Sequence, residues 1–188
     1  MSTQNLYLAR HGQTALNAEG RLRGLANPPL DHVGVAEAER LAWALADKGA
    51  GIVLCSPLDR ARRTGEIISQ AAGIPLQIDE RFNDRDYGPQ TGQIKADVET
   101  QYGSVDEAPG VEPVHDIIER ALPALDSVLD EDTTRDVIIV THDALIRPLI
   151  LCIDGRIRAT APTASWNHLR RESGHWSVVA IDQKPAAD

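Results

Sequence analysis

Aromatic residues and long apolar runs are scarce in this sequence. Phe, Trp and Tyr together make up 4% of the 188 residues, so a hydrophobic core has to be built mainly from Leu, Ile, Val and Ala. No run is apolar over the length that a membrane-spanning helix needs. The N-terminus also lacks the basic segment and long apolar stretch of a secretion signal. We therefore expect a cytoplasmic protein that does not associate with a membrane.

Cysteine is nearly absent, and histidine does not occur at metal-binding spacings. The two cysteines, Cys55 and Cys152, stand in apolar surroundings and are expected to be reduced residues of the core. Neither Cys-x-x-Cys nor His-x-x-x-His is found. We therefore expect neither a metal ion nor another cofactor.

Basic residues are outnumbered by acidic ones. The sequence has 19 Lys and Arg against 28 Asp and Glu, and its formal net charge is -9 with neutral histidines. Proteins that bind nucleic acid favour a basic face, so we expect no nucleic-acid partner. The total charge does not exclude a small anionic substrate, because the local field in a cleft decides that binding.

Short apolar runs alternate with amphipathic segments, which predicts an α/β protein. The composition is that of a globular chain, and the length fits one domain over residues 1–188. Strands are expected at residues 6–9, 52–55, 76–78 and 136–141, and helices at residues 34–48, 56–72, 114–129 and 145–153. A hairpin formed by residues 166–169 and 176–181 is expected to close the chain. We predict a three-layer α/β/α fold with a mostly parallel central sheet.

The helix expected at residues 56–72 has start and stop signals. Ser56 is a good N-cap, Pro57 suits the first helical position and Gly73 ends the helix. This helix follows a strand directly. Its first turn can therefore bring Arg60 to the crevice at the ends of the strands.

A histidine or an arginine follows three of the expected strands. Arg10 and His11 follow the first strand, Arg60 the second and His142 the last parallel one. Ligands in such sheets bind beyond the carboxyl ends of the strands, so we expect these residues to converge. A guanidinium beside a neutral imidazole suits a nucleophile that attacks phosphorus, because the arginine gathers negative charge and the ring nitrogen supplies a lone pair. At each position considered alone, a polar turn after a strand is the alternative.

Two other segments are candidates for contacts with a substrate. The loop at residues 20–30 is rich in Gly and Pro, and its Arg21 and Arg23 can reach the crevice or stay in solvent. Residues 89–113 have weak patterning, several carboxylates and a short helix expected at 94–102. A stretch of this length is often a lid or a substrate loop, and an acidic excursion without a role is the equal alternative.

Taken together, these motifs resemble the histidine phosphatase superfamily, which includes cofactor-dependent phosphoglycerate mutases and small phosphomonoesterases. The likeness runs from about residue 6 to the terminal hairpin and implies a phosphoglycerate mutase-like fold. It rests on Leu8-Ala9-Arg10-His11-Gly12-Gln13-Thr14 with the later Asn17 and Arg21, on Ser56-Pro57-Leu58-Asp59-Arg60-Ala61 with Thr64, and on Val140-Thr141-His142 with Arg147.

The resemblance implies a phosphohistidine mechanism without a metal ion. His11 would take the phosphoryl group, and Arg10, Arg60 and His142 would bind its oxygens. Water would then attack the phosphohistidine and release phosphate. The substrate-binding candidates that the resemblance adds are Asn17, Arg21 and Ala144.

The chain departs from the family pattern at three places. The family's proton-donating glutamate, four residues before the glycine matching Gly88, is replaced by Asp84, with Asp86 as a competitor and a structural turn aspartate as the alternative. Gln90-Thr91-Gly92 stands where the family often has Trp-Glu-Gly. Asp143 and Ala144 follow the second histidine in place of two glycines, and the charge of Asp143 disfavours highly anionic substrates.

From these features we predict a phosphoric monoester hydrolase of the histidine acid phosphatase type that acts on a small phosphorylated metabolite. Residues 89–113 show no cluster of basic side chains to hold a substrate carboxylate or retain a bisphosphate, which a mutase requires. A cofactor-dependent phosphoglycerate mutase-like phosphotransferase and a non-catalytic phosphate-binding module are the alternatives. The sequence leaves the oligomeric state open, a homodimer included.

Overall fold

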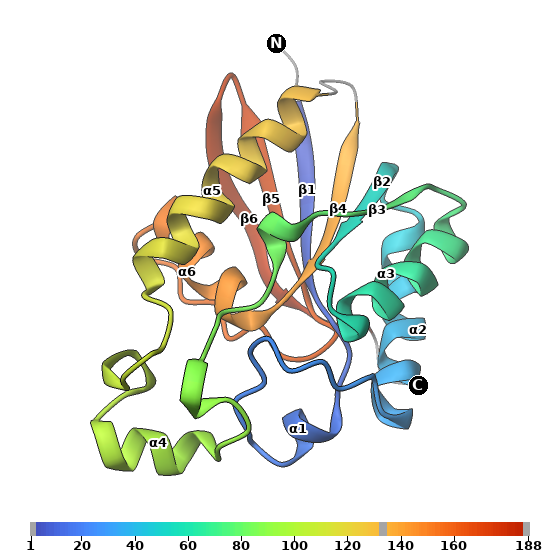
Figure 1. The fold of residues 1–188 in the computed structure, drawn as a ribbon. Helices are drawn as coiled ribbons and strands as arrows, with labels where there is room; N and C mark the ends of the chain where they lie inside the picture. The colour runs from blue at the N-terminus through green and yellow to red at the C-terminus, as the bar shows by residue number, and fades with distance from the viewer. Residues whose placement is uncertain (1–2, 132–134, 186–188) are drawn as a thin grey trace.

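A mostly parallel sheet forms the centre of the molecule (Figure 1). The computed structural model describes residues 3–131 and 135–185. Within these ranges the sheet has six strands in the order β3-β2-β4-β1-β5-β6. Strands β3, β2, β4 and β1 run parallel, and β5 and β6 add an antiparallel hairpin at one edge. The strands are β1 (Thr3–Arg10), β2 (Ala50–Cys55), β3 (Leu76–Ile78), β4 (Asp136–Thr141), β5 (Trp166–Glu172) and β6 (His175–Gln183).

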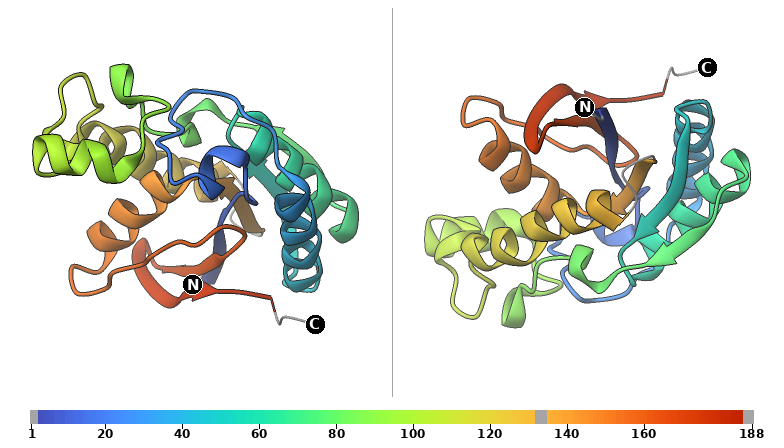
Figure 2. Two further views of the ribbon diagram at one scale, coloured as in Figure 1. Left: turned by 90° about the horizontal axis from the view of Figure 1, so that it is seen from below. Right: turned by 90° about the horizontal axis from the view of Figure 1, so that it is seen from above.

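Helices cover both faces of the sheet, which gives the predicted three layers. Figure 2 shows α2 and α3 on one face and α5 and α6 on the other. The α-helices are α1 (Ala15–Ala18), α2 (His32–Ala46), α3 (Asp59–Ala72), α4 (Lys95–Tyr102), α5 (Val114–Glu131) and α6 (Asp143–Ile153). Three short 3-10 helices lie at Glu80–Phe82, Gly88–Gln90 and Val105–Glu107. All expected helices and strands are present, with their ends shifted by a few residues, and α1 was not expected.

The alternation of side chains along β1 explains why the sheet is covered on both faces. Leu6 and Leu8 point into a core shared with α5 and α6, whereas Tyr7 and Ala9 point into a core shared with α2 and α3. Successive residues of a strand face opposite sides. A strand buried on both sides therefore has to be apolar at nearly every position, which is the run that the sequence shows.

The predicted start of α3 is wrong. The helix begins at Asp59 with Leu58 in the N-cap position, and no side chain caps it. The hydroxyl oxygen of Ser56 instead accepts a hydrogen bond from the backbone N–H of Leu58 at 3.3 Å, and it lies 2.8 Å from His142 Nε2. Ser favours short side-chain-to-backbone turns as readily as helix caps, so the local signal did not decide between them. Gly73 ends the helix in the left-handed region, as expected.

The prediction that both cysteines belong to the core is wrong for Cys152. Cys55 is buried, but Cys152 is exposed. The buried residues of α6 are Leu145, Ile146, Leu149 and Ile150, which leaves Cys152 on its outer side. Within the described ranges, no helix has both the length and the apolar character to cross a membrane.

Residues 89–113 pack over the end of the sheet where β1 and β4 finish. Figure 1 places α4 and the loop around α1 together at this end. The segment is tied to the earlier loop by backbone hydrogen bonds from Leu22 N–H to Gln93 O at 2.9 Å and from Lys95 N–H to Gly20 O at 2.9 Å. It also shares a small apolar cluster, formed by Leu22, Tyr87, Val98, Val105 and Ala108. We call residues 89–113 the roof segment.

The loop that carries His11 lies directly against the first turn of α2. A Cβ atom on Gly34 would overlap the carbonyl oxygen of Gln13, and one on Gly12 would overlap the carbonyl oxygen of Gly34. Asp31 caps this turn, since its carboxylate accepts a hydrogen bond from Gly34 N–H at 2.8 Å. The backbone after β1 is therefore fixed by contacts that only glycine permits.

Gly34→Ala tests this close approach. Alanine in a helix is ordinarily about 1 kcal/mol more favourable than glycine, but here overpacking should reverse the sign and lower the free energy of unfolding by about 2 kcal/mol. Urea denaturation measures the change. Gly155→Ala is the matched control, because no atom lies within 4 Å of the Cβ it would add. Equal or greater stability of Gly34→Ala than of wild type would contradict the contact.

Candidate active site

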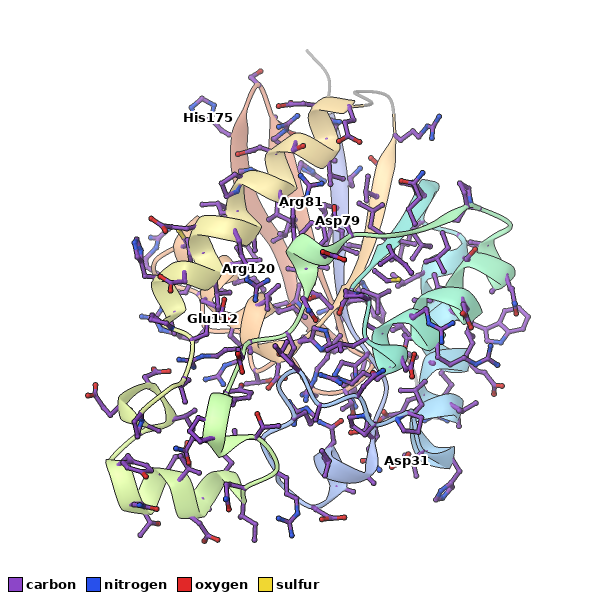
Figure 3. The ribbon with its side chains drawn as sticks, in the orientation of Figure 1. Asp31, Asp79, Arg81, Glu112, Arg120 and His175 are labelled. Atoms are coloured by element: carbon purple, nitrogen blue, oxygen red, sulfur yellow. The ribbon has the colours of Figure 1, made fainter. Side chains whose placement is uncertain are left out.

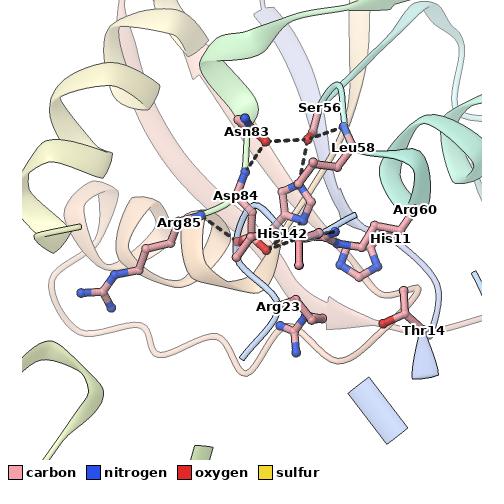
Figure 4. Close-up of polar contacts among 12 residues, drawn as sticks. His11, Thr14, Arg23, Ser56, Leu58, Arg60, Asn83, Asp84, Arg85 and His142 are labelled. Carbon is pink, nitrogen blue, oxygen red and sulfur yellow. Dashed lines mark hydrogen bonds and ion pairs between the residues drawn. The ribbon is translucent and has the colours of Figure 1, made fainter. Parts of the chain in front are cut away.

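The two predicted histidines lie next to each other at the edge of the sheet, with their rings tilted relative to one another. Their ring centroids are 5.1 Å apart with an interplanar angle of 59°, and neither side chain is exposed. Adjacent parallel strands position them, since Arg10 at the end of β1 is in register with Thr141 at the end of β4. His11 and His142 therefore leave the sheet side by side, and their convergence was predicted. Figure 4 shows the surrounding polar contacts.

Arg60 comes from the first turn of α3 and is completely buried. Its Nη1 donates to Ala26 O at 2.8 Å, and its Nη2 donates to Gly24 O and to Asp84 Oδ2, both at 2.8 Å. A buried guanidinium is tolerated only when oxygens surround it. These three acceptors fix its plane, while its Nε has no hydrogen-bond partner.

Arg10 at the end of β1 and Arg23 in the loop after α1 contact the same carboxylate oxygen. Asp143 Oδ1 lies 3.2 Å from Arg10 Nη2 and 2.8 Å from Arg23 Nη2. Arg10 Nη1 also donates to Ala161 O at 2.8 Å. Ala161 has a φ of 48°, a strained value for a residue other than glycine, so the loop before β5 is held in an unusual shape where it meets Arg10.

Several buried nitrogen atoms at this site have no hydrogen-bond partner. Within the described part of the chain, five of the seven such side-chain atoms belong to the cluster: Arg10 Nε, His11 Nε2, Arg23 Nε, Arg60 Nε and His142 Nδ1. Leaving a buried polar group unpaired typically costs about 1–3 kcal/mol, so native proteins rarely tolerate several together. Three of these atoms, the Nε atoms of Arg10, Arg23 and Arg60, are N–H donors, so the cluster is suited to an anion that offers several oxygen acceptors.

Both histidines are held in the neutral form. Burial lowers the pKa of His11 well below its usual range, and the charges of Arg60, Arg10 and Arg23 lower it further. Burial and Arg60 act on His142 in the same way. His11 Nδ1 lies 2.6 Å from Gly12 O, a carbonyl that can only accept, so Nδ1 carries the proton and Nε2 carries the lone pair. A neutral imidazole with a free Nε2 can act as a nucleophile.

Asp84 lies within the same cluster. Its Oδ2 is 2.8 Å from Arg60 Nη2 and 3.4 Å from His142 Nδ1, and its Oδ1 accepts a hydrogen bond from Arg85 N–H at 2.8 Å. Burial raises the pKa of Asp84 above its usual range and outweighs the opposing charges of Arg60 and Arg23. A carboxyl group with a raised pKa can donate a proton. Its competitor Asp86 is exposed and accepts a hydrogen bond from Gly88 N–H in a turn.

Arg120 on α5 holds the backbone that carries Asp84. Its guanidinium donates to the carbonyl oxygens of Arg81 at 2.9 Å, Asn83 at 3.0 Å and Asp84 at 3.1 Å. Glu112 pairs with the same guanidinium at 3.0 Å. Figure 3 shows Arg120 and Glu112 beside the segment that contains Arg81. The position of Asp84 is thereby set from the face of the sheet that α5 covers.

A cavity of about 450 Å³ adjoins the histidine cluster, and we call it the outer chamber. Arg23 and Asp143 line it and also contact the cluster, and the roof segment contributes Lys95 and Glu99 to its wall. Apolar side chains make up much of the remaining wall. Its other basic residues are Arg21, Arg85, Arg147 and Arg158.

The predicted substrate-binding candidates differ in position. Ala144 and Arg21 line the outer chamber, although Arg21 is paired with Glu19 at 2.6 Å. The Asn17 side chain is used locally, since its Oδ1 accepts hydrogen bonds from the Thr14 backbone N–H at 3.0 Å and hydroxyl at 2.8 Å. This capping box forms the unexpected helix α1. A direct hydrogen bond from Asn17 to a substrate stays a prediction.

Arg23 and Ser56 are the site residues that sequence reasoning did not select. Arg23 was considered as one of two loop arginines, but no local feature distinguished it from Arg21. The acid Asp143, directly after His142 at the end of a strand, is the signal that could have identified Arg23, because a partly buried acid at such a place favours a cation as its partner. Ser56 could not be distinguished from an ordinary helix cap.

Comparison with known proteins identifies the family. The profile described as histidine phosphatase superfamily (branch 1) matches residues 6–184. The chain belongs to the histidine phosphatase superfamily.

Relatives in this superfamily carry two kinds of name. The chain is 33% identical over 174 residues to a 2,3-bisphosphoglycerate-dependent phosphoglycerate mutase of Methylobacterium sp. (strain 4-46), with 84% of each chain covered. It is 28% identical over 189 residues to an adenosylcobalamin/alpha-ribazole phosphatase of Salmonella typhimurium, which covers 94% of this chain and 90% of the other. Membership of this superfamily indicates that the chain is an enzyme, and either a phosphatase or a mutase role fits it.

The fold also resembles that of a solved phosphoglycerate mutase. The crystal structure of a phosphoglycerate mutase from Bacillus anthracis superposes with a TM-score of 0.88 at 22% identity, covering 97% of this chain and 94% of the other. At this identity the likeness concerns the fold. The predicted phosphoglycerate mutase-like α/β fold is confirmed.

His142→Gln tests whether the ring is buried in the neutral form. A histidine whose folded pKa is depressed stabilises the protein fully above its unfolded pKa of about 6.5 and loses that contribution as the pH falls toward the folded value. Between pH 7 and pH 5 this loss reaches about 2 kcal/mol for a group that stays neutral throughout the interval. The free energy of unfolding of His142→Gln should therefore fall by up to about 2 kcal/mol less than that of wild type over this interval, measured by urea denaturation. Equal falls would mean that the folded protein protonates His142 near its usual pKa.

Proposed function

We propose that the protein is a phosphomonoesterase that hydrolyses a small phosphorylated metabolite through a phosphohistidine at His11. The observation that carries this proposal is the set of five unpaired buried nitrogens, which includes the neutral Nε2 of His11. Three guanidiniums and two imidazoles in one cluster match the demands of phosphoryl transfer, which are positioning and stabilisation of charge.

In the first step, His11 Nε2 attacks phosphorus and the bond from phosphorus to the ester oxygen breaks. Arg10, Arg60 and His142 bind the phosphoryl oxygens and stabilise their charge during transfer. The departing oxygen takes a proton from Asp84, whose protonated form is favoured by burial, which raises its pKa. The products of this step are an alcohol, a phosphohistidine and the Asp84 carboxylate.

In the second step, water attacks the phosphohistidine. Asp84 now accepts a proton from the water, the bond between Nε2 and phosphorus breaks, and inorganic phosphate leaves. The ring of His11 returns to its neutral form with the proton on Nδ1, where Gly12 O holds it. After one turnover the protein has neither gained nor lost a proton, because Asp84 is protonated again and His11 is free.

The outer chamber is proposed to hold the organic part of the substrate. Its volume of about 450 Å³ lies within the range of small-molecule sites, and its walls combine apolar and charged side chains. The roof segment closes one side of it, which supports its role as a substrate loop. We keep Arg21 and Ala144 as substrate-binding residues because both line this chamber.

Hydrolysis is favoured over mutase activity by the charge of the roof segment. Lys95 is its one basic residue, and it lies 3.5 Å from Glu99. Arg85 in the chamber is likewise paired with Asp106 at 2.6 Å. A mutase has to retain a bisphosphate between two transfers, whereas a hydrolase has only to admit water. The similarity to a phosphoglycerate mutase keeps that activity as the second candidate.

The function is tested by measuring phosphate release and mutase turnover side by side. A panel of phosphate monoesters that includes 3-phosphoglycerate and α-ribazole phosphate should yield inorganic phosphate with at least one member. His11→Ala should reduce this release by at least about 10³-fold and abolish trapping of labelled phosphate on the protein. His115→Ala, which alters an exposed side chain on α5, is the matched control. Dominant isomerase activity would favour the mutase, and absence of both turnover and labelling would favour a phosphate-binding module.

Asp84→Asn tests the proton donor. An alkyl leaving group needs the proton far more than an activated aryl group does, so the loss should be about 10²-fold or greater with alkyl phosphates and much smaller with p-nitrophenyl phosphate. Steady-state kinetics with both substrates give the comparison. Asp86→Asn should leave both rates unchanged. Equal losses for the two substrates in Asp84→Asn would argue against proton donation.

A further inference from the structure

A carboxylate of the protein already engages Arg10, which is proposed to bind the phosphoryl group, and Arg23 beside it. Asp143 Oδ1 contacts Arg10 Nη2 at 3.2 Å and Arg23 Nη2 at 2.8 Å, and the Asp143 side chain is 22% exposed. Both arginines are themselves about 90% buried, with side-chain exposures of 10%. A single oxygen between two guanidiniums occupies a place that a phosphate oxygen could take.

Asp143 is ionised in this position. Burial alone would raise its pKa, but Arg10, Arg23 and Arg147 outweigh burial and hold the pKa below its usual range. The cluster therefore contains three guanidinium charges, of Arg10, Arg23 and Arg60, and Asp143 supplies a permanent counter-charge to the first two. Asp84 is the other acid nearby, and its pKa is shifted in the opposite direction.

The location of Asp143 makes its charge act on two regions at once. It begins helix α6 directly after His142, so its backbone is fixed next to the proposed phosphoryl site. Its side chain also lines the outer chamber. An anion bound at the histidines and an anion in the nearest part of the chamber would both experience its repulsion.

We propose that Asp143 is a specificity-determining residue that competes with phosphate oxygens for Arg10 and Arg23. The competition weakens the binding of free inorganic phosphate and of substrates with a second negative charge close to the ester oxygen. Product phosphate then leaves readily, and monoesters with an uncharged group next to the ester bond are the favoured substrate class. This inference rests on the proposed function, because it assumes that phosphate binds between these guanidiniums.

The alternative is that Asp143 acts only by holding Arg10 and Arg23 in place. The two roles have opposite consequences. Asparagine keeps an oxygen that can accept from both arginines but removes the charge, so a counter-charge predicts tighter phosphate binding in Asp143→Asn. A purely positioning carboxylate predicts weaker binding, since the neutral amide holds the guanidiniums less firmly.

Isothermal titration of inorganic phosphate at pH 7.5 separates the two. We expect the Kd of Asp143→Asn to be at least about tenfold lower than that of wild type, with the difference shrinking as salt is added. Asp143→Glu, which keeps the charge, should stay within about threefold of wild type. Asp97→Asn on the exposed side of α4 removes the same charge elsewhere and should not alter the Kd. Thermal unfolding of each variant establishes that it is folded.

A second measurement uses turnover. The ratio of kcat/KM for phenyl phosphate to that for 3-phosphoglycerate should fall by about tenfold or more in Asp143→Asn, because the variant no longer repels the substrate carboxylate. Unchanged or weaker phosphate binding by folded Asp143→Asn overturns the inference and leaves the phosphatase proposal standing. Failure of wild type and Asp143→Asn alike to bind phosphate or to turn over any ester overturns both.

Discussion

The burial of three guanidinium groups at one edge of the sheet is the constraint on which the rest of this structure depends. Arg10, Arg23 and Arg60 are removed from water, and each is held by backbone carbonyls or by a carboxylate. Burial keeps the two histidines neutral and these cations reinforce it, while the same cations limit how far burial can neutralise the neighbouring acids. Because the charges are fixed before any ligand arrives, stabilisation of the phosphoryl group in the proposed reaction would need little rearrangement.

Burial and the nearby guanidinium charges shift the pKa values of two aspartates, Asp84 and Asp143, in opposite directions. Asp84 is sufficiently desolvated for its pKa to rise, whereas Asp143 meets two arginines at one oxygen and its pKa falls. One carboxyl group can therefore exchange a proton with a reacting oxygen while the other remains a fixed charge. Asp84, which stands where the resemblance to the family leads us to expect a glutamate, is carried by backbone whose carbonyl oxygens Arg120 on α5 holds.

The convergence of His11, Arg60 and His142 was predictable because it depends on strand ends, and these are visible in the sequence as apolar runs that stop at polar residues. The fold class followed from the same alternation. Ser56 and Arg23 were not predictable in this way, since their roles depend on partners 86 and 120 residues distant in the chain. A local sequence pattern indicates which backbone conformation a residue favours. The roles of Ser56 and Arg23 depend instead on the distant residues that contact their side chains. Cys152 illustrates the same limit, since Leu149 and Ile150 shortly before it in sequence are buried while Cys152 is exposed.

The loop before β5 gives the site a particular place in the order of folding. The carbonyl oxygen of Ala161, which accepts a hydrogen bond from the Arg10 side chain, lies 151 residues further along the chain. The carbonyl oxygen of Ser165 accepts a hydrogen bond from the backbone N–H of Arg10. During synthesis Arg10 therefore emerges early, whereas the segment at residues 161–165 that holds it is made near the end. Contacts this distant in sequence form late and slowly. A nascent chain that has completed its parallel strands would therefore still lack the two carbonyl oxygens that hold Arg10 in place.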